Sequence, residues 1–273
     1  MDCAFICDKE DYFLNRIFAG VQKPRMMEPY HLNLIKNEVS ILPIASANKS
    51  RQLDQSIFLA VREKCGHIAM SPQKAALVST AVKKNNAVNI SDGRLYAIAT
   101  MPALLDQSID NWQKMNLCIQ VEDAFMALAA RIAAKRVGRL HLVGNNILKM
   151  QALAQLIYEE SGLICPISKI FPKGDHLFLL PPQGNHPENL KKLRTDQQIW
   201  NQWANAAYLG QETAQPANNT NKRRPSLPAS LTQSVLFYLL TKTKKSTLPN
   251  NWPDTLFLLA KKGEYYGLQP VSL

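Results

Sequence analysis

The sequence lacks any hydrophobic run long enough to cross a membrane. Its 273 residues are 46% hydrophobic, but no stretch of about 18 uncharged apolar residues occurs, and a transmembrane helix needs at least that length. The start, MDCAFICDKEDYF, has acids where a secretory signal would be basic, and its apolar run is too short for such a signal. These absences predict a globular, cytoplasmic chain with a substantial core and no membrane partner.

Cysteine and histidine motifs for metal binding are also missing. No CxxC pair occurs, and no histidine lies three or four residues from a cysteine or another histidine on an evident helix. The five cysteines are Cys3, Cys7, Cys65, Cys118 and Cys165. Because they are odd in number, widely spread and mostly set in apolar segments, they are typical of reduced structural thiols. We therefore expect no metal site.

The familiar catalytic signatures are absent as well. There is no G-x-S-x-G turn for a serine nucleophile, and no glycine precedes a lysine-serine or lysine-threonine pair at the spacing of a phosphate-binding P-loop. The catalytic residues therefore remain unknown, and whether the chain is an enzyme stays open.

Acidic residues are scarce, especially toward the C-terminus. Against 32 Lys and Arg the chain has 21 Asp and Glu, which gives a net charge of +11. Between residues 216 and 262 eight basic residues face a single acid, Asp254. Such a balance favours anionic partners, either nucleic acid, phosphorylated metabolites or an acidic protein. The alternative is a solvated, lysine-rich surface that only keeps the protein soluble.

Residues 1–137 alternate apolar runs with helical patterns, which predicts an N-terminal α/β portion. The segment 46–66 places Leu53, Ile57, Phe58 and Val61 on one helical face and ends in glycine. Residues 121–138 form the best helical pattern of the chain, with acids first and bases last. Between these helices, Asp92-Gly93 predicts the tight turn of a β-hairpin.

Residues 138–210 predict a Rossmann-like β-α-β portion. The stretch GRLHLVGNNILKMQALAQLIYEESGLICPI, residues 138–167, reads as strand, glycine turn, helix, glycine stop and second strand, and residues 176–182 add a third compact apolar run. The predicted fold class is therefore α/β, Rossmann-like, with a mostly parallel sheet and flanking helices. This likeness is one of fold and licenses no function by itself.

The C-terminal quarter has a different composition. Residues 211–229 are polar and rich in proline, which indicates a linker or mobile loop. Residues 230–273 predict a basic helix followed by a β-hairpin turned at KKGE, residues 261–264.

The turn GNNILK departs from the dinucleotide fingerprint. Aligning Gly144 with the first glycine puts Asn146 and Lys149 at the second and third, where a Cβ and a bulky side chain obstruct phosphate approach and helix packing. Residues 162–174 contain no acid to hold ribose hydroxyls. NAD is therefore disfavoured, NADP is a weak alternative, and the cofactor is otherwise unknown.

A helix N-terminus attracts anions without any glycine code. Asn145 or Asn146 is placed to cap this helix, while Lys149 and the strand-ending pair Ser168-Lys169 suit a phosphate group better than a hydroxyl pair. The predicted site for an anionic, nucleotide-like or phosphate-bearing ligand consists of Gly144, Asn145, Asn146, Lys149, Ser168 and Lys169. The alternative is a capped helix whose pocket holds nothing.

A second hypothesis is a nucleic-acid-associated accessory protein that acts through its basic C-terminal region. The residues that would carry it are Lys222, Arg223, Arg224, Lys242, Lys244 and Lys245, with Tyr265 and Tyr266 as aromatic partners. A third hypothesis is a non-catalytic scaffold that binds a protein partner. The sequence leaves the identity of the ligand and the oligomeric state open.

Overall fold

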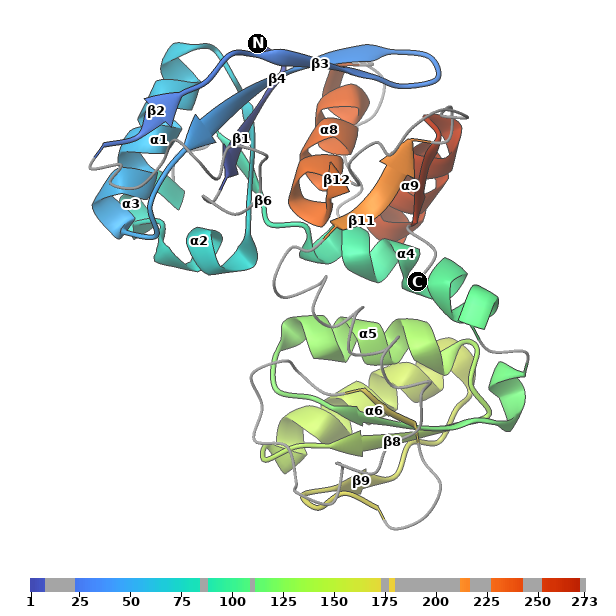
Figure 1. Cartoon of the computed structure of the whole chain (residues 1–273). Coiled ribbons are helices and arrows are strands. Elements are labelled where there is room, and N and C mark those ends of the chain that lie inside the picture. Colours follow the sequence, from blue (N-terminus) through green and yellow to red (C-terminus); the bar gives the residue numbers. More distant parts are fainter. Residues whose placement is uncertain are drawn as a thin grey trace. The chain divides into compact units, whose positions relative to one another are not determined.

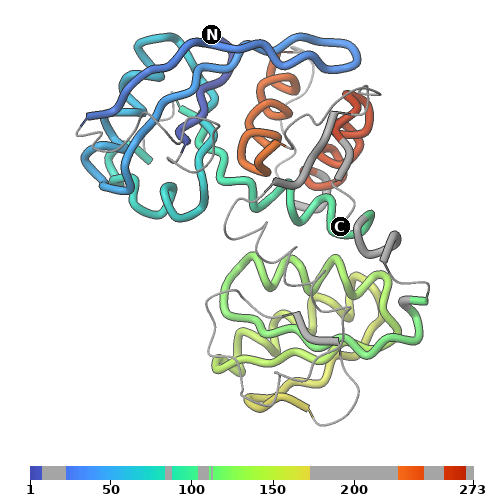
Figure 2. Tube along the Cα trace, viewed as in Figure 1, coloured from blue at the N-terminus to red at the C-terminus, as the bar shows by residue number. Residues whose placement is uncertain are grey.

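A computed structural model describes residues 1–7, 23–83, 88–108, 111–172, 177–179, 212–216, 227–242 and 252–270. The chain divides into two compact units. Unit 1 comprises Met1–Ala99 and Ala206–Val271, and unit 2 comprises Thr100–Asn205 with the last two residues. Each is a mixed α/β structure in which helices flank a sheet with parallel strands (Figure 1). The blue and red parts of the trace in Figure 2 both belong to unit 1.

Unit 1 is built on a six-stranded sheet of order β2-β4-β1-β5-β6, with β3 also paired to β4. Its strands are β1 (Cys3–Cys7), β2 (Arg25–Met26), β3 (Tyr30–Asn33), β4 (Glu38–Ala45), β5 (His67–Met70) and β6 (Asn89–Ser91). The strands β4, β1, β5 and β6 run parallel, and β2 and β3 run antiparallel to β4. Every residue of β1 is buried, as a central parallel strand requires.

Pro43 lies inside β4, although a proline favours a strand end or an edge. On its outer side β4 pairs with β3 up to Ile41 and with β2 from Ile44 onward. Pro43 therefore falls at the break between the two antiparallel partners, where the outer ladder is already interrupted. Its carbonyl still accepts from the Met27 N–H at 3.0 Å.

Helices cover both faces of the unit 1 sheet. On one face lie α1 (Ser50–Arg62), α2 (Pro72–Leu77) and α3 (Thr80–Lys83), and on the other lies α8 (Ala229–Lys242) (Figure 1). The predicted helix in 46–66 is confirmed, but its buried side chains are Leu53, Ser56, Ile57 and Ala60, whereas Phe58 and Val61 are exposed. These buried residues are separated by three or four positions, so they share one face of the helix. The small side chains of Ser56 and Ala60 let that face lie close to the sheet.

Helix α8 is buried on nearly all sides, and its predicted position is confirmed. Its polar residues Ser230, Thr232, Gln233 and Ser234 are all buried. The side-chain oxygen of Gln233 accepts from the Tyr96 N–H at 3.1 Å. Gly93 has φ +86°, and a Cβ there would lie 2.4 Å from the Ser230 nitrogen. The loop after β6 therefore needs glycine both for its backbone conformation and for the approach of α8.

The hairpin expected at Asp92-Gly93 is wrong. Strand β6 ends at Ser91, and α4 (Arg94–Ser108) follows, with Pro102 inside it. The Asp92 carboxylate accepts from the Arg94 N–H at 3.1 Å, so the aspartate satisfies the first N–H of a helix. The apolar run after the turn becomes a helix because Tyr96, Ala97 and Ile98 are all buried.

The C-terminal hairpin is wrong as well. The KKGE stretch lies within α9 (Trp252–Tyr265), and Gly267, with φ +72°, follows shortly after its end. Strand β13 (Leu268–Pro270) then pairs with β11 (Glu212–Pro216), which also pairs with β12 (Leu227–Pro228). Two of these antiparallel strands fall in the segment expected as a linker, whose residues 217–226 lie outside the described residues.

Unit 2 has a four-stranded, wholly parallel sheet of order β10-β7-β8-β9. Its elements are η1 (Trp112–Lys114), β7 (Asn116–Gln120), α5 (Ala124–Ala134), β8 (Arg139–Val143), α6 (Ile147–Ser161), β9 (Ile167–Ser168) and β10 (Leu177–Leu179). The predicted succession of strand, helix, glycine stop and strand over 138–167 is confirmed by β8, α6, Gly162 with φ +72°, and β9.

All five cysteines are free and buried, as their apolar settings predicted. Burial raises the pKa of the Cys3 and Cys118 thiols to about 12, and that of Cys65 and Cys165 to about 11. Such thiols stay protonated near neutrality and are poor nucleophiles. In the described part of the chain, no helix combines the length and the apolar character that a membrane crossing requires.

The amino edge of the unit 1 sheet is fixed to α8 by polar contacts. The Tyr238 hydroxyl donates to Asp2, whose other carboxylate oxygen accepts from the Ser40 N–H at 2.8 Å. His67 Nε2 lies 3.2 Å from the Thr241 hydroxyl, and its buried Nδ1 has no hydrogen-bond partner within the described residues. Burial therefore lowers the pKa of His67 below 6.5.

We expect the stability of unit 1 to depend on pH through His67. Folding disfavours its charged form, so the unfolded chain binds more protons, and stability is lost as pH falls below about 6.5. Urea unfolding between about pH 5 and 7.5 should show a slope of at most about 1.4 kcal/mol per pH unit, which His67→Gln flattens. The exposed His31→Gln is the control, and an equal flattening by it would contradict this assignment.

Candidate functional site

The structure brings Gly144 and Ser168 together at the carboxyl edge of the unit 2 sheet. Val143 and Ser168 are paired in the register of β8 and β9, and the Gly144 N–H donates to the Ser168 carbonyl at 3.1 Å. Lys169 follows directly and is exposed. The carboxyl ends of parallel strands are where open α/β sheets usually bind ligands.

Asn146 is the N-cap of α6, one of the two positions that the sequence predicted. Its side-chain oxygen accepts from the Lys149 N–H at 3.0 Å. The side chains of Asn145 and Lys149 are exposed. The first two helical N–H groups, of Ile147 and Leu148, have no partner in the described structure, so this end of α6 retains two donors and a positive dipole.

Gly144 serves packing. A Cβ at this residue would lie 2.9 Å from the Met150 sulfur and 2.9 Å from the Val121 carbonyl oxygen. The glycine therefore lets α6 and the neighbouring loop approach β8 closely. Its presence in the turn is explained without a phosphate.

Ser168 has its hydroxyl proton already engaged. The hydroxyl donates to the Ile170 carbonyl, and His141 Nε2 lies 3.0 Å from the same oxygen. Because the serine has one proton to give, His141 must be the donor in the second contact. His141 is not among the residues that the sequence predicted for this site. In this arrangement Ser168 has no hydrogen left to donate to an anion. Lys149, Lys169 and the amides at the start of α6 must therefore supply the attraction for it.

Acids lie on the other side of the same edge. The loop after β7 contains Glu122 and Asp123, and its Val121 N–H donates to the Val143 carbonyl at 2.7 Å. Asp123 caps α5 by accepting from the Phe125 and Met126 N–H groups, each at 2.9 Å. The sequence predicted only that acids stand at the start of the helical pattern over 121–138. The edge is thus acidic beside β7 and basic beside β9, so an anion is favoured on the β9 side only.

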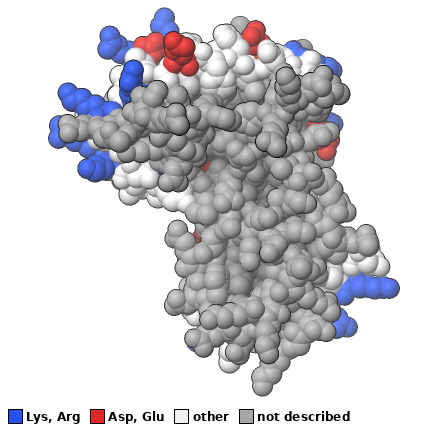
Figure 3. All heavy atoms as spheres, in the orientation of Figure 1, with Lys and Arg blue, Asp and Glu red and all other residues white. Residues whose placement is uncertain are grey.

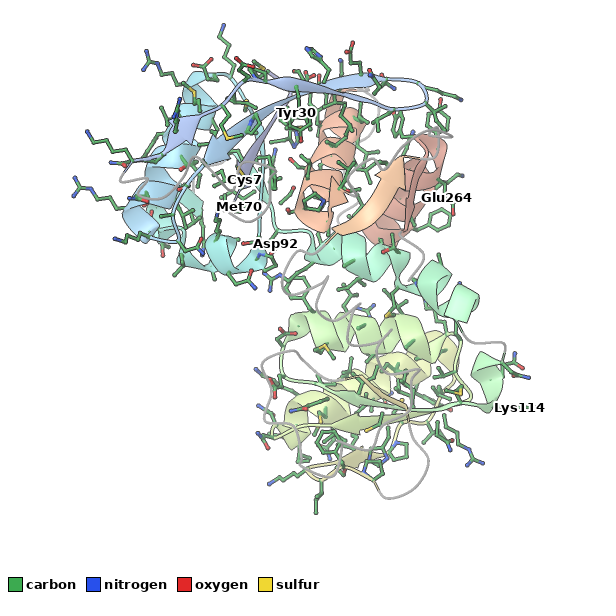
Figure 4. All side chains as sticks on the ribbon, in the orientation of Figure 1. Cys7, Tyr30, Met70, Asp92, Lys114 and Glu264 are labelled. Carbon is green, nitrogen blue, oxygen red and sulfur yellow. The ribbon has the colours of Figure 1, made fainter. Side chains whose placement is uncertain are left out.

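A second polar edge, in unit 1, was missed from the sequence. Strands β1, β4, β5 and β6 end there, and Figure 4 labels Cys7, Met70 and Asp92 along it. Lys74, in the first turn of α2, is fully buried, and its ammonium donates to the Cys7 carbonyl at 2.6 Å and the Ser46 carbonyl at 3.3 Å. A lysine in a short polar helix resembles a solvated one in sequence, so only tertiary structure reveals it.

Further polar groups continue along the unit 1 edge. Arg94 Nε donates to the Asp92 carboxylate at 2.7 Å, and both side chains are largely buried. The hydroxyl of Ser91 is buried and has no hydrogen-bond partner among the described residues. These groups are mostly satisfied within the chain, which favours a structural role for this edge.

Metal binding finds no support in the described residues, where no group of three His, Cys, Asp or Glu side chains could hold an ion. The chain matches no protein-family model, no curated protein and no solved structure. The candidate site therefore rests on its own geometry.

Replacing Lys74 should destabilise unit 1. Lys74→Met removes a buried donor and leaves the Cys7 and Ser46 carbonyls without it, so we expect a loss of about 2 kcal/mol or more in the free energy of unfolding. Lys83→Met is the matched control, because Lys83 also donates to a carbonyl, that of Ala76 at 3.3 Å, but in an exposed position. Its cost should stay below about 0.5 kcal/mol in urea unfolding. Equal costs would contradict the structural role of Lys74.

Proposed function

We propose that this chain is a Rossmann-like protein that binds a small anionic, phosphate-bearing or nucleotide-like ligand at the carboxyl edge of unit 2. The observation that carries the proposal is the junction of β8, α6 and β9. There the open amides of Ile147 and Leu148, at the positive end of α6, face the same edge as the end of β9. The exposed Lys149 and Lys169 add positive charge from the helix and from the strand end.

The strand order supports the Rossmann-like description and argues against a dinucleotide. In a Rossmann fold the first four strands lie in the spatial order 3-2-1-4. The unit 2 order β9-β8-β7-β10 matches this pattern when β7 is taken as the first strand. The first loop is then Val121-Glu122-Asp123, which has no glycine and presents two acids where a pyrophosphate would lie. Gly144 belongs to the second loop, where Asn145 and Asn146 replace the usual ribose-binding acid. A phosphate monoester on the β9 side fits these charges better than NAD or NADP.

Thermal shift and calorimetry with inorganic phosphate, AMP, NAD and NADP test the proposal. We expect AMP and phosphate to stabilise the protein, and the double variant Lys149→Ala, Lys169→Ala to weaken AMP binding by about tenfold or more, since each lost charged contact is worth about 1 kcal/mol. Lys135→Ala, which removes an exposed cation elsewhere in unit 2, should bind like the wild type. No stabilisation by any of these ligands, or equal binding by the double variant, would reject the proposal.

Nucleic-acid binding is the second candidate function, and one observation on α9 favours it. Tyr265 is 47% exposed, and the ammonium groups of Lys36 and Lys262 lie 4.0 and 5.1 Å from its ring centre. Phe257, 68% exposed, has Lys261 at 5.8 Å. Exposed rings beside cations are typical of surfaces on which single-stranded bases stack.

The basic residues that the sequence predicted for this function lie mostly outside the described residues. Only Lys242 lies within the described residues, and its ammonium is 5.3 Å from the ring of Tyr238. Lys222, Arg223, Arg224, Lys244 and Lys245 lie outside them. Figure 3 shows Lys and Arg side chains at the margins of the described surface. The exposed rings of α9 beside these cations suit the stacked bases of a short single strand.

Fluorescence anisotropy with labelled oligo(dT) and oligo(rU) at increasing salt tests this function. Binding that weakens with salt and falls by about fivefold or more in Tyr265→Ala would support it, because stacking is worth about 1–3 kcal/mol per base. Tyr158→Ala, which removes an exposed tyrosine of α6, is the control. Absent or salt-independent binding would leave the partner-binding scaffold as the remaining proposal.

A further inference from the structure

One face of the unit 2 sheet carries polar side chains where a parallel sheet is usually apolar. Asn116 pairs with Arg139 and Cys118 with His141 in the register of β7 and β8. Because successive side chains alternate between faces, Asn116, Arg139 and His141 share one face. The alternate face, with Leu140 and Leu142, is the one against α6, as the contact of Gly144 with Met150 indicates.

A cavity of about 240 Å³ lies at the amino ends of these two strands. Its lining comprises Asn116, Leu117, Arg139, Leu140, His141, Ile164 and Pro166. The lining thus combines an amide, a guanidinium and an imidazole with four apolar residues. Ile164 is 78% exposed at this cavity, which makes it an apolar surface available to a ligand.

We propose that this cavity binds a small monoanionic carboxylate with a short apolar tail. Arg139 supplies the only formal positive charge of the described lining, which matches one negative charge. Its planar guanidinium holds a carboxylate with two parallel hydrogen bonds. Asn116 and His141 lie beside it in the lining as polar groups, and Ile164 and Pro166 offer apolar surface to the tail.

The size of the cavity restricts the ligand. A volume of 240 Å³ corresponds to about eight water molecules at about 30 Å³ each. Pockets for larger ligands range from about 300 to 1,000 Å³. The cavity therefore suits a carboxylate with a tail of a few carbons better than a nucleotide.

This cavity is distinct from the proposed phosphate site. Arg139 begins β8 and Gly144 follows its last residue, so at about 3.3 Å per residue the two lie about 16 Å apart along the strand. The two sites also use different cations, Arg139 in one and Lys149 with Lys169 in the other. His141 lies between them, since it lines the cavity and contacts Ser168.

NMR titration of the full chain with butanoate tests the inference, with butan-1-ol as the neutral probe of similar shape. Butanoate should bind saturably and shift the ring resonances of His141, and butan-1-ol should bind at least about tenfold more weakly, because a charged hydrogen bond is worth about 1.5–3 kcal/mol. Absence of saturable binding, or equal binding of the alcohol, would overturn the inference.

Variants distinguish the cavity from the proposed phosphate site. Arg139→Met should weaken butanoate binding by about tenfold or more. Arg139→Lys keeps the charge but loses the two parallel hydrogen bonds of the guanidinium, so its affinity for butanoate should lie between those of Arg139→Met and the wild type. Lys135→Met is the matched control. The Lys149→Ala, Lys169→Ala variant should bind butanoate normally, so loss of AMP binding with retained butanoate binding concerns the phosphate site alone. Unchanged butanoate binding in Arg139→Met would reject the cavity proposal.

Discussion

The packing of α8 against the unit 1 sheet is the constraint on which the rest of that unit depends. A parallel sheet must be covered on both faces, and α1, α2 and α3 cover only one of them. Helix α8 covers the other and is therefore buried almost throughout. Its polar side chains hold it in place, since the buried Gln233 accepts from α4, and Tyr238 and Thr241 contact groups at the sheet's amino edge.

The two units use the carboxyl edges of their sheets differently. In unit 1 the edge is closed by its own side chains, because Lys74 saturates carbonyls of two strand ends and Arg94 is paired with Asp92. In unit 2 the corresponding edge leaves lysines exposed and helix amides unpaired. The two edges therefore differ in whether their polar groups are open to a ligand, although both are formed by parallel strands with helices between them.

The sequence was sufficient where the governing interactions are local. It predicted β8, α6 and β9, a cap at Asn145 or Asn146 and the glycine stop at Gly162, all of which depend on neighbouring residues. It was wrong at Asp92-Gly93 and at KKGE, because those turn signals are overridden by packing with distant partners such as Tyr96 and Gln233, 137 residues apart. The short strand β7 was missed as the first of its sheet, and with it the placement of Glu122 and Asp123 beside Gly144.

The division of unit 1 into two stretches of sequence has a consequence for synthesis. Translation completes the whole of 100–205 before Ala229–Lys242 emerges. Unit 2 is therefore free to fold while strands β1 and β5 still lack the helix that covers their second face. Strands β1 and β5 therefore stay uncovered on this face until α8 has been synthesised. During that interval the apolar face of the sheet is available to a chaperone.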